Sequence, residues 1–225
     1  MINIQKNSIN QICGEFVRET CKDRDPSHGY DHMKQVKKNS MIIYHGENIN
    51  DPYIKNLCKI VAWLHDVADH KYDKDNQLEY VIKKFLSEHF LEDSKLIWDI
   101  IQRISYSKEV KQGKTDWLLT LGEKGCIVRN IVSDGDKLEA IGKIGIERCV
   151  EFSKEQYYKN NGENMPAKLL IDAVCKHADE KLLRLKDEFI NTKTGKCLAE
   201  PLHNEMINIL THLSDHILLN TSDIN

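Results

Sequence analysis

The stretch AWLHDVADH, residues 62–70, places an ionisable pair at the end of an apolar run. Ile60, Val61 and Leu64 lead directly into His65 and Asp66. A carboxylate that leaves water without a partner costs several kcal/mol, so such a group is normally hydrogen-bonded, ion-paired or bound to a metal. The pair therefore predicts either a metal site or a local ion pair at the C-terminal end of a helix.

Four further groups could meet this pair. His28 and His32 stand before or at the opening of a helix, and Asp134 and Asp136 flank Gly135 just before the apolar segment KLEAIGKIGI. Each group stands at the end of an expected element, where side chains can converge without breaking the core. Imidazole and carboxylate ligands together suit Mn²⁺, Fe²⁺, Co²⁺, Ni²⁺ or Zn²⁺, whereas Mg²⁺ prefers more oxygen.

The elements that must position these residues are predicted to be helices. Apolar residues recur at helical spacing, and only four prolines occur. The segment that starts at Asp51 and Pro52 carries apolar residues on nearly every face, which is typical of a central, buried helix. The expected helices are 2–21, 31–44 with Asp31 as N-cap, one that starts at 52 and ends at the His65-Asp66 pair, 75–90, 94–106, 127–131, 137–152, 167–191 and 195–219.

The expected architecture is one all-α domain over residues 1–225. Residues 24–152 would form the core around the metal site, and helices at about 165–220 would pack on it. The polar segment SKEVKQGKTDWLLTLGEKG, residues 107–125, is predicted to be a surface excursion or a lid.

Composition narrows the function classes. A formal net charge of −3 over 225 residues provides no broad basic field, which argues against an intrinsic nucleic-acid binder. No apolar run reaches the roughly 20 residues of a membrane span, and the N-terminus lacks a secretory pattern. We therefore expect no membrane partner and a cytoplasmic location, with the nucleus as an alternative. The apolar C-terminal helix could pair with a second copy or close the core, and both alternatives stay open.

Five blocks of sequence resemble one known family. They are DPSHGYDHMKQV, VAWLHDVADHKYD, ISYS, IVSDGDKLEAIGKIGIERC and EKLLRLKDEFINTKTGKCLAE, and they span roughly residues 24–205. In this order they resemble the HD-domain superfamily of metal-dependent phosphohydrolases, and more narrowly its small stand-alone members in bacteria and fungi. The resemblance implies an all-α HD-type helical bundle and hydrolysis of a phosphate ester or anhydride by metal-activated water.

The resemblance also implies a set of metal ligands. His32, His65, Asp66 and Asp136 match the family's positions, and Asp136 stands in DGDKL where relatives have ADKL or ADRL. Gly135 replaces the usual alanine, which could loosen the turn but removes no ligand. Two-metal branches add two further histidines between the His-Asp pair and the last aspartate. His70 and His89, the histidines in that interval, are poorly placed for this role, so one divalent ion is expected, with Mg²⁺ kept among the candidates.

Two residues are expected to take part in the reaction. Asp69 stands where nucleotide-specific relatives carry an acid that orients or deprotonates the attacking water, although a surface acid is the alternative. His28 resembles a leaving-group residue or a residue that supports a ligand. It could also exchange roles with His32 as the first ligand.

Three further assignments have competing explanations. Lys71 and Lys137 could neutralise phosphate oxygens, or they could be solvated surface lysines. Asp134 could support the metal site from behind a ligand, or it could cap the helix that begins near Lys137.

The expected function is phosphohydrolysis of a nucleotide, with release of pyrophosphate from nucleoside triphosphates as one form of it. Two alternatives remain open. One is an inactive module that binds metal and nucleotide, and the other is a cyclic- or signalling-nucleotide phosphodiesterase on the same scaffold. Substrate choice is expected to depend on residues 107–126, which match the family least well.

Overall fold

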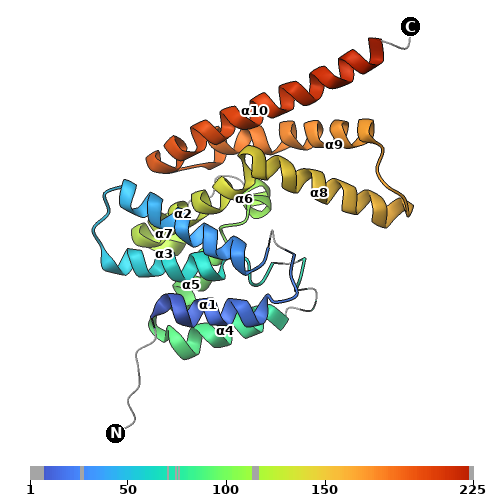
Figure 1. Cartoon of the computed structure of the whole chain (residues 1–225). Coiled ribbons are helices and arrows are strands. Elements are labelled where there is room, and N and C mark those ends of the chain that lie inside the picture. Colours follow the sequence, from blue (N-terminus) through green and yellow to red (C-terminus); the bar gives the residue numbers. More distant parts are fainter. Residues whose placement is uncertain are drawn as a thin grey trace. The chain divides into compact units, whose positions relative to one another are not determined.

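The computed structural model describes residues 8–25, 28–69, 71–73, 75, 77–112 and 117–222, with side chains through residue 213 except that of residue 112. Within these residues the chain forms helices, turns and bends and no strand (Figure 1). The all-α prediction is therefore confirmed. None of the described helices is long and apolar enough to cross a lipid bilayer.

Ten α-helices follow one another in the described part of the chain. They are α1 Ile9–Thr20, α2 Tyr30–Gly46, α3 Pro52–Leu64, α4 Gln77–His89, α5 Ser94–Ile101, α6 Tyr106–Gln112, α7 Leu118–Lys137, α8 Gly142–Asn161, α9 Ala167–Glu180 and α10 Lys193–Ser222. Short 3-10 turns occupy Leu91–Asp93, Leu138–Ala140 and Leu182–Arg184, and a π-helical turn occupies Leu185–Phe189.

The chain divides into two compact units, Met1–Asp136 and Lys137–Asn225. The first unit contains all the predicted metal ligands. The expectation of a single domain over the whole chain stays a prediction.

Helix α3 is the centre of the first unit. Eight of its 13 residues are buried, and α1, α2 and α5 pack against it. Asp51 starts the helix as predicted, because its carboxylate accepts hydrogen bonds from the backbone N–H groups of Tyr53 and Ile54 and Pro52 follows it. Trp63, near the other end of the helix, donates from Nε1 to Asn10 of α1 at 3.3 Å. The prediction of a central buried helix that ends at the His-Asp pair is confirmed.

The polar segment 107–125 is mostly exposed in its described residues, as expected of a surface excursion, but it is largely helical. It contributes α6 and the start of α7, whose helix is kinked at Gly122 (φ 65°). The fully buried Arg129 contacts two residues of this segment, since its guanidinium pairs with Glu109 at 2.7 Å and lies 4.0 Å from the centre of the Trp117 ring. Residues 113–116 of the segment lie outside the described residues.

Two helix boundaries near the site differ from the expectation. Helix α2 begins at Tyr30 with Gly29 as N-cap, so the prediction that Asp31 is the cap is wrong. The N–H of His28 donates to the Asp25 carbonyl at 3.1 Å, and a Cβ on Gly29 would lie 3.1 Å from the same carbonyl oxygen. The segment 134–136 belongs to the last turn of α7 instead of preceding a helix, so the interpretation of Asp134 as a helix cap is also wrong.

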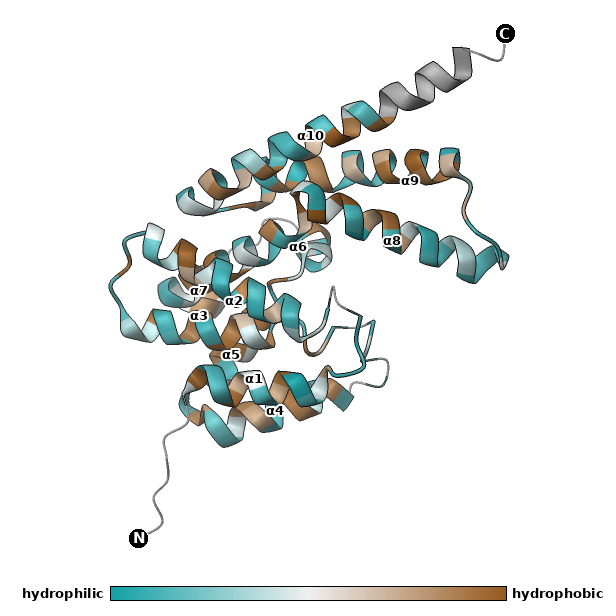
Figure 2. Cartoon of the chain, viewed as in Figure 1, coloured by the Kyte–Doolittle hydropathy of each residue, from teal (hydrophilic) through white to brown (hydrophobic). Residues whose placement is uncertain are grey.

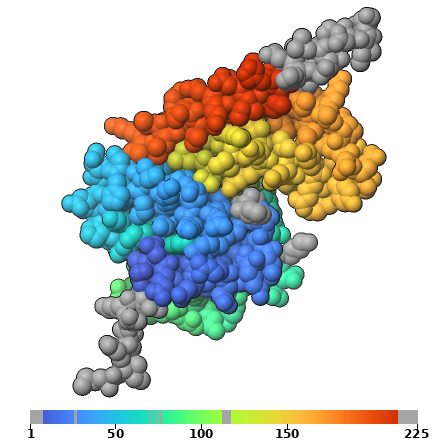
Figure 3. Space-filling view, in the orientation of Figure 1, coloured from blue at the N-terminus to red at the C-terminus, as the bar shows by residue number. Residues whose placement is uncertain are grey.

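The second unit consists mainly of α8, α9 and α10, which contact one another. Gly162, in the left-handed conformation (φ 73°), ends α8, and its N–H donates to the Tyr158 carbonyl. The C-terminal half of α8 is mostly hydrophilic and exposed (Figure 2). On the face of the first unit that Figure 3 shows, α1 and α2 form much of the surface.

Candidate metal centre

Three of the four predicted ligands form one cluster. Nε2 of His32 lies 3.4 Å from Oδ1 of Asp136, and Nε2 of His65 lies 3.6 Å from the same oxygen. One ligand atom from each residue lies within 4.8 Å of the other two. The described residues therefore include a His-His-Asp cluster that is compatible with a divalent metal.

Three helix ends bring the cluster together. His32 lies in the first turn of α2, His65 follows the last residue of α3, and Asp136 lies in the last turn of α7. Helices α2 and α3 form the most extensive helix–helix contact in the described chain. The position of Asp136 depends on its neighbour Gly135, whose carbonyl accepts a hydrogen bond from the amide of Asn39 at 3.2 Å.

Gly135 allows α7 to approach α2 closely. A Cβ at this position would lie 2.6 Å from Oγ of Ser40 and 3.2 Å from the carbonyl oxygen of Val36. Both contacts are with short or backbone groups that have little freedom to move. We expected glycine to loosen this turn. The structure shows a steric role instead, because the missing Cβ permits the close contact with α2 that brings Asp136 to the histidines.

Replacing Gly135 with alanine is expected to destabilise the chain by about 1 to 3 kcal/mol, since overpacking forces a backbone shift. The same shift should weaken Mn²⁺ binding. Denaturant unfolding and a Mn²⁺ titration measure the two effects. Gly14→Ala is the matched control, because its Cβ would meet only ordinary contacts at 3.6 Å or more. Equal stability and Mn²⁺ affinity in Gly135→Ala and the parent would contradict this account.

Buried polar atoms of the site lack hydrogen-bond partners among the described residues. They are Nδ1 of His32, Nε2 of His65 and Oδ2 of Asp66. Nδ1 of His65 lies 2.9 Å from the Ala62 carbonyl oxygen, and since a carbonyl only accepts, this nitrogen carries the proton. Nε2 is then the nitrogen with a free lone pair, the arrangement usual for a metal-binding histidine. The donor set therefore fits a divalent ion.

Asp66 is not one of the three clustered residues, but its Oδ2 is buried without a hydrogen-bond partner among the described residues, like a ring nitrogen of each histidine. Burial raises the pKa of its carboxyl, and the nearby His65 opposes this rise. Two hydrogen bonds from Arg24 hold the backbone here, with Nη1 donating to the Asp66 carbonyl at 2.7 Å and Nη2 donating to the Val67 carbonyl. The role of Asp66 as a fourth ligand stays a prediction.

The electrostatics of the cluster favour an added positive charge. Burial disfavours the imidazolium of His65, but the carboxylates of Asp136 and Asp66 outweigh it and raise the pKa of His65 to about 9. Burial also disfavours the carboxylate of Asp136, yet the imidazoles of His32 and His65 hold its pKa well below the usual value. Without a metal, the site therefore holds a proton on His65 at neutral pH.

This proton makes metal affinity dependent on pH. His65 must release it to bind a metal, so the apparent affinity for Mn²⁺ should rise about tenfold per pH unit as pH approaches 9 and level off above it. Calorimetry at pH 6, 7 and 8, in buffers with different ionisation enthalpies, measures the released proton. An affinity that stays constant over this range would contradict the assignment of His65 as a ligand.

Asp69 lies in the turn after the His-Asp pair. Its Oδ1 accepts a hydrogen bond from the backbone N–H of Lys71 at 2.8 Å. Its negative charge adds to the effect of burial in raising the pKa of Asp66. The charge of Asp69 also favours the ammonium of Lys108, a residue of α6 that the sequence did not single out. Burial lowers the pKa of Lys108, and the charges of Asp69 and Glu79 oppose this change. The catalytic role of Asp69 stays a prediction.

The other predicted site residues lie in different surroundings. His28 is partly exposed, and its ring centre lies 6.5 Å from that of His32. Nζ of Lys71 lies 3.2 Å from Nε2 of His28. Lys137 and Asp134 are buried, in contrast to the interpretation of Lys137 as a solvated lysine. Their roles at the site stay predictions, and His70 lies outside the described residues.

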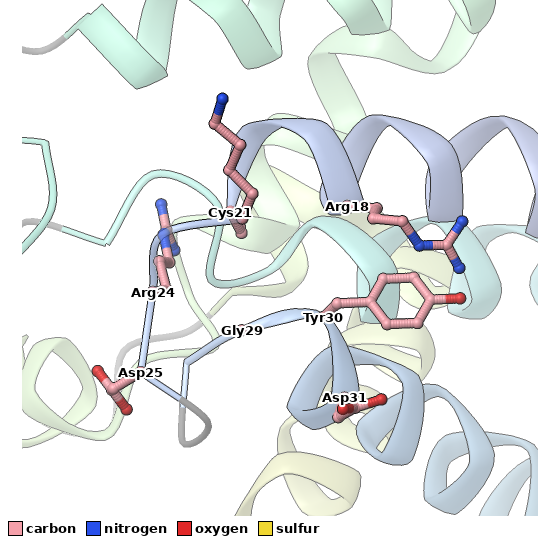
Figure 4. A pocket seen from close by; sticks show the side chains of 8 residues that line it. Arg18, Cys21, Arg24, Asp25, Gly29, Tyr30 and Asp31 are labelled. Atoms are coloured by element: carbon pink, nitrogen blue, oxygen red, sulfur yellow. The ribbon is translucent and has the colours of Figure 1, made fainter.

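A pocket of about 370 Å³ adjoins the loop that carries His28. Figure 4 shows Arg18 beside the Tyr30 ring and Asp25 farther along the pocket. The Arg18 guanidinium lies 4.4 Å from the centre of that ring. The residues that line the pocket are Arg18, Cys21, Lys22, Arg24, Asp25, Gly29, Tyr30 and Asp31, and none is a cluster residue.

No model of a known protein family matches the chain. The chain is similar to YpgQ of Bacillus subtilis, at 27% identity over 90% of each chain. It is also similar to the L803 protein of Acanthamoeba polyphaga mimivirus, at 27% identity over 90% of this chain and 79% of that protein. Both relatives are described as uncharacterized.

Solved structures share the fold. An HD-superfamily hydrolase from Bacillus thuringiensis matches with a TM-score of 0.60 and 26% identity, over 92% of this chain and 95% of that chain. YpgQ in complex with ADP matches with a TM-score of 0.63 and 23% identity, over 92% and 94% of the two chains. A protein from Lactobacillus plantarum matches with a TM-score of 0.70 and 23% identity, over 97% of this chain and all of that chain.

Proposed function

We propose that this chain, which has the fold of the HD-domain phosphohydrolases, is a metal-dependent phosphohydrolase that acts on nucleotides. The observation that carries the proposal is the His32, His65 and Asp136 cluster with its unpartnered buried nitrogens. The YpgQ structure contains ADP, which supports a nucleotide as the substrate class.

Four residues would hold one ion in this proposal. His32, His65 and Asp136 form the cluster, and Asp66 would add its buried Oδ2. When bound, a divalent ion would lower the pKa of a water molecule and neutralise phosphate charge. Mn²⁺, Fe²⁺, Co²⁺, Ni²⁺ and Zn²⁺ suit the two imidazoles better than Mg²⁺ does.

The chain's other residues would handle protons and substrate charge. Asp69 would accept the proton of the attacking water. The hydrogen bond from the backbone N–H of Lys71 to its Oδ1 would hold the carboxylate in place. Lys71 would neutralise phosphate oxygens, and His28 would serve the leaving group. Residues 107–126, with Lys108 on α6, would influence which substrate is accepted.

The test is product analysis with Mn²⁺ and a panel of nucleoside tri-, di- and monophosphates together with a cyclic diester. Release of pyrophosphate or phosphate from the noncyclic nucleotides is the expected result. Turnover of the diester alone would instead support a phosphodiesterase. Nucleotide-induced thermal stabilisation without any product over hours would support an inactive binding module.

A further inference from the structure

Asp25 and Tyr72 surround His28 beside the metal cluster. Nδ1 of His28 lies 3.2 and 3.3 Å from the two carboxylate oxygens of Asp25. The hydroxyl of Tyr72 donates to the same carboxylate, and its ring centre lies 5.7 Å from that of His28. On the opposite side of the imidazole, Nζ of Lys71 lies 3.2 Å from Nε2.

These contacts determine where His28 carries its proton. A carboxylate only accepts hydrogen bonds, so Nδ1 of His28 is the donor to Asp25. The ammonium of Lys71 only donates, so Nε2 is the acceptor. Neutral His28 is therefore the Nδ1–H tautomer, and Nε2 is the nitrogen that can exchange a proton with a substrate.

The loop around Asp25 is also tied to the turn after the metal-binding pair. Arg24 stacks its guanidinium 4.4 Å from the centre of the Tyr72 ring, while its nitrogens donate to the carbonyls of Asp66 and Val67. The side chain of His28 is 25% exposed, so a substrate can reach it. This attachment holds His28 at a fixed place relative to the His-Asp turn.

We propose that Asp25, assisted by Tyr72, is a positioning residue that holds His28 so that Nε2 faces the leaving group of the substrate. The catalytic part of this inference rests on the proposed function. A carboxylate behind an imidazole fixes its tautomer and stabilises the imidazolium, as in other histidine-dependent active sites.

The proton balance of the step is complete. Water forms the new bond to phosphorus and gives a proton to Asp69. The bond from phosphorus to the leaving oxygen breaks, and its electron pair stays on that oxygen. This oxygen takes the Nε2 proton of a His28 imidazolium, which forms once Lys71 turns from Nε2 to the phosphate oxygens of the substrate. The Nδ1–H of His28 remains bonded to Asp25. His28 leaves the step as the Nδ1–H tautomer, the form that the contacts support.

The test combines nitrogen-15 NMR of the histidines in the metal-free chain with kinetics in Mn²⁺. Among the signals of the ten histidines, those of His28 are identified as the ones that His28→Gln removes. Parent His28 should be the Nδ1–H tautomer, which both neighbours favour. In a Lys71→Met background, which removes the donor to Nε2, adding Asp25→Ala should move His28 towards the Nε2–H form. Asp25→Ala alone should lower kcat about ten- to a hundredfold, with KM and bound Mn²⁺ nearly unchanged. Asp25→Glu should restore part of kcat.

Asp23→Ala is the matched control, since Asp23 is an exposed aspartate two residues away, and it should leave tautomer and kcat unchanged. A parent His28 in the Nε2–H form, or the same tautomer in Lys71→Met with and without Asp25→Ala, would overturn the positioning role. So would an unchanged kcat of Asp25→Ala when the parent is active. If the parent releases no product from any nucleotide, the proposed function fails, and the NMR result alone decides whether Asp25 positions His28.

Discussion

Replacing Asp136 with alanine is expected to abolish tight binding of a divalent metal and to lower hydrolysis by roughly a thousandfold or more. Oδ1 of Asp136 is the atom that both imidazoles approach, at 3.4 and 3.6 Å. Its removal takes away the negative charge that outweighs the burial of His65. Metal content after dialysis against Mn²⁺, and product release with saturating nucleotide, are the measurements.

The Asp136→Ala result needs a check on folding. Asp136→Asn keeps the side-chain volume and removes the charge, so it separates loss of the ligand from loss of packing. Circular dichroism should show parent helix content in both variants. Parent-like metal content in Asp136→Asn and Asp136→Ala would show that the cluster does not hold the ion.

Replacing Asp69 with asparagine is expected to lower kcat by roughly a hundredfold to ten-thousandfold while leaving metal content unchanged. Asparagine retains an oxygen that can accept the hydrogen bond from the Lys71 N–H, which Asp69 accepts at 2.8 Å. It cannot accept a proton from water at neutral pH. The two effects therefore separate in steady-state kinetics and metal analysis.

Asp75→Asn is the matched control for Asp69→Asn, because Asp75 is an exposed aspartate close by in the chain. Its kcat should equal that of the parent. Parent-like activity in Asp69→Asn would mean that the metal is structural or that another group accepts the proton.

The sequence was most informative where local signals determine the structure. Asp51 and Pro52 start α3 through capping, and continuous apolar spacing identifies this helix as central. A histidine and an aspartate directly after such a helix need a compensating group, so His65 and Asp66 could be selected as site residues. His28, His32, Asp134 and Asp136 were candidates from their positions at element ends, and the resemblance to a family singled out His32 and Asp136 as ligands. The structure brings both histidines to Asp136.

Contacts between distant residues could not be predicted in this way. Arg24 reaches carbonyls 42 and 43 residues later in the chain, which no periodicity indicates. Arginine is usually a surface residue, yet Arg129 is fully buried. It pairs with Glu109 and contacts Trp117, two residues of the segment that was expected to be a surface excursion. Gly135 resembles a helix breaker, whereas its actual constraint is the nearby Ser40.

The most direct test of the central claim is phosphate and pyrophosphate release from nucleotides by the Mn²⁺-loaded parent and by Asp66→Ala. Oδ2 of Asp66 is buried without a partner among the described side chains, so a bound ion is the group that would satisfy it. The account predicts release by the parent and none above background by Asp66→Ala, together with loss of bound metal in the variant. Equal release by both proteins, or none by a parent that binds Mn²⁺, would contradict it.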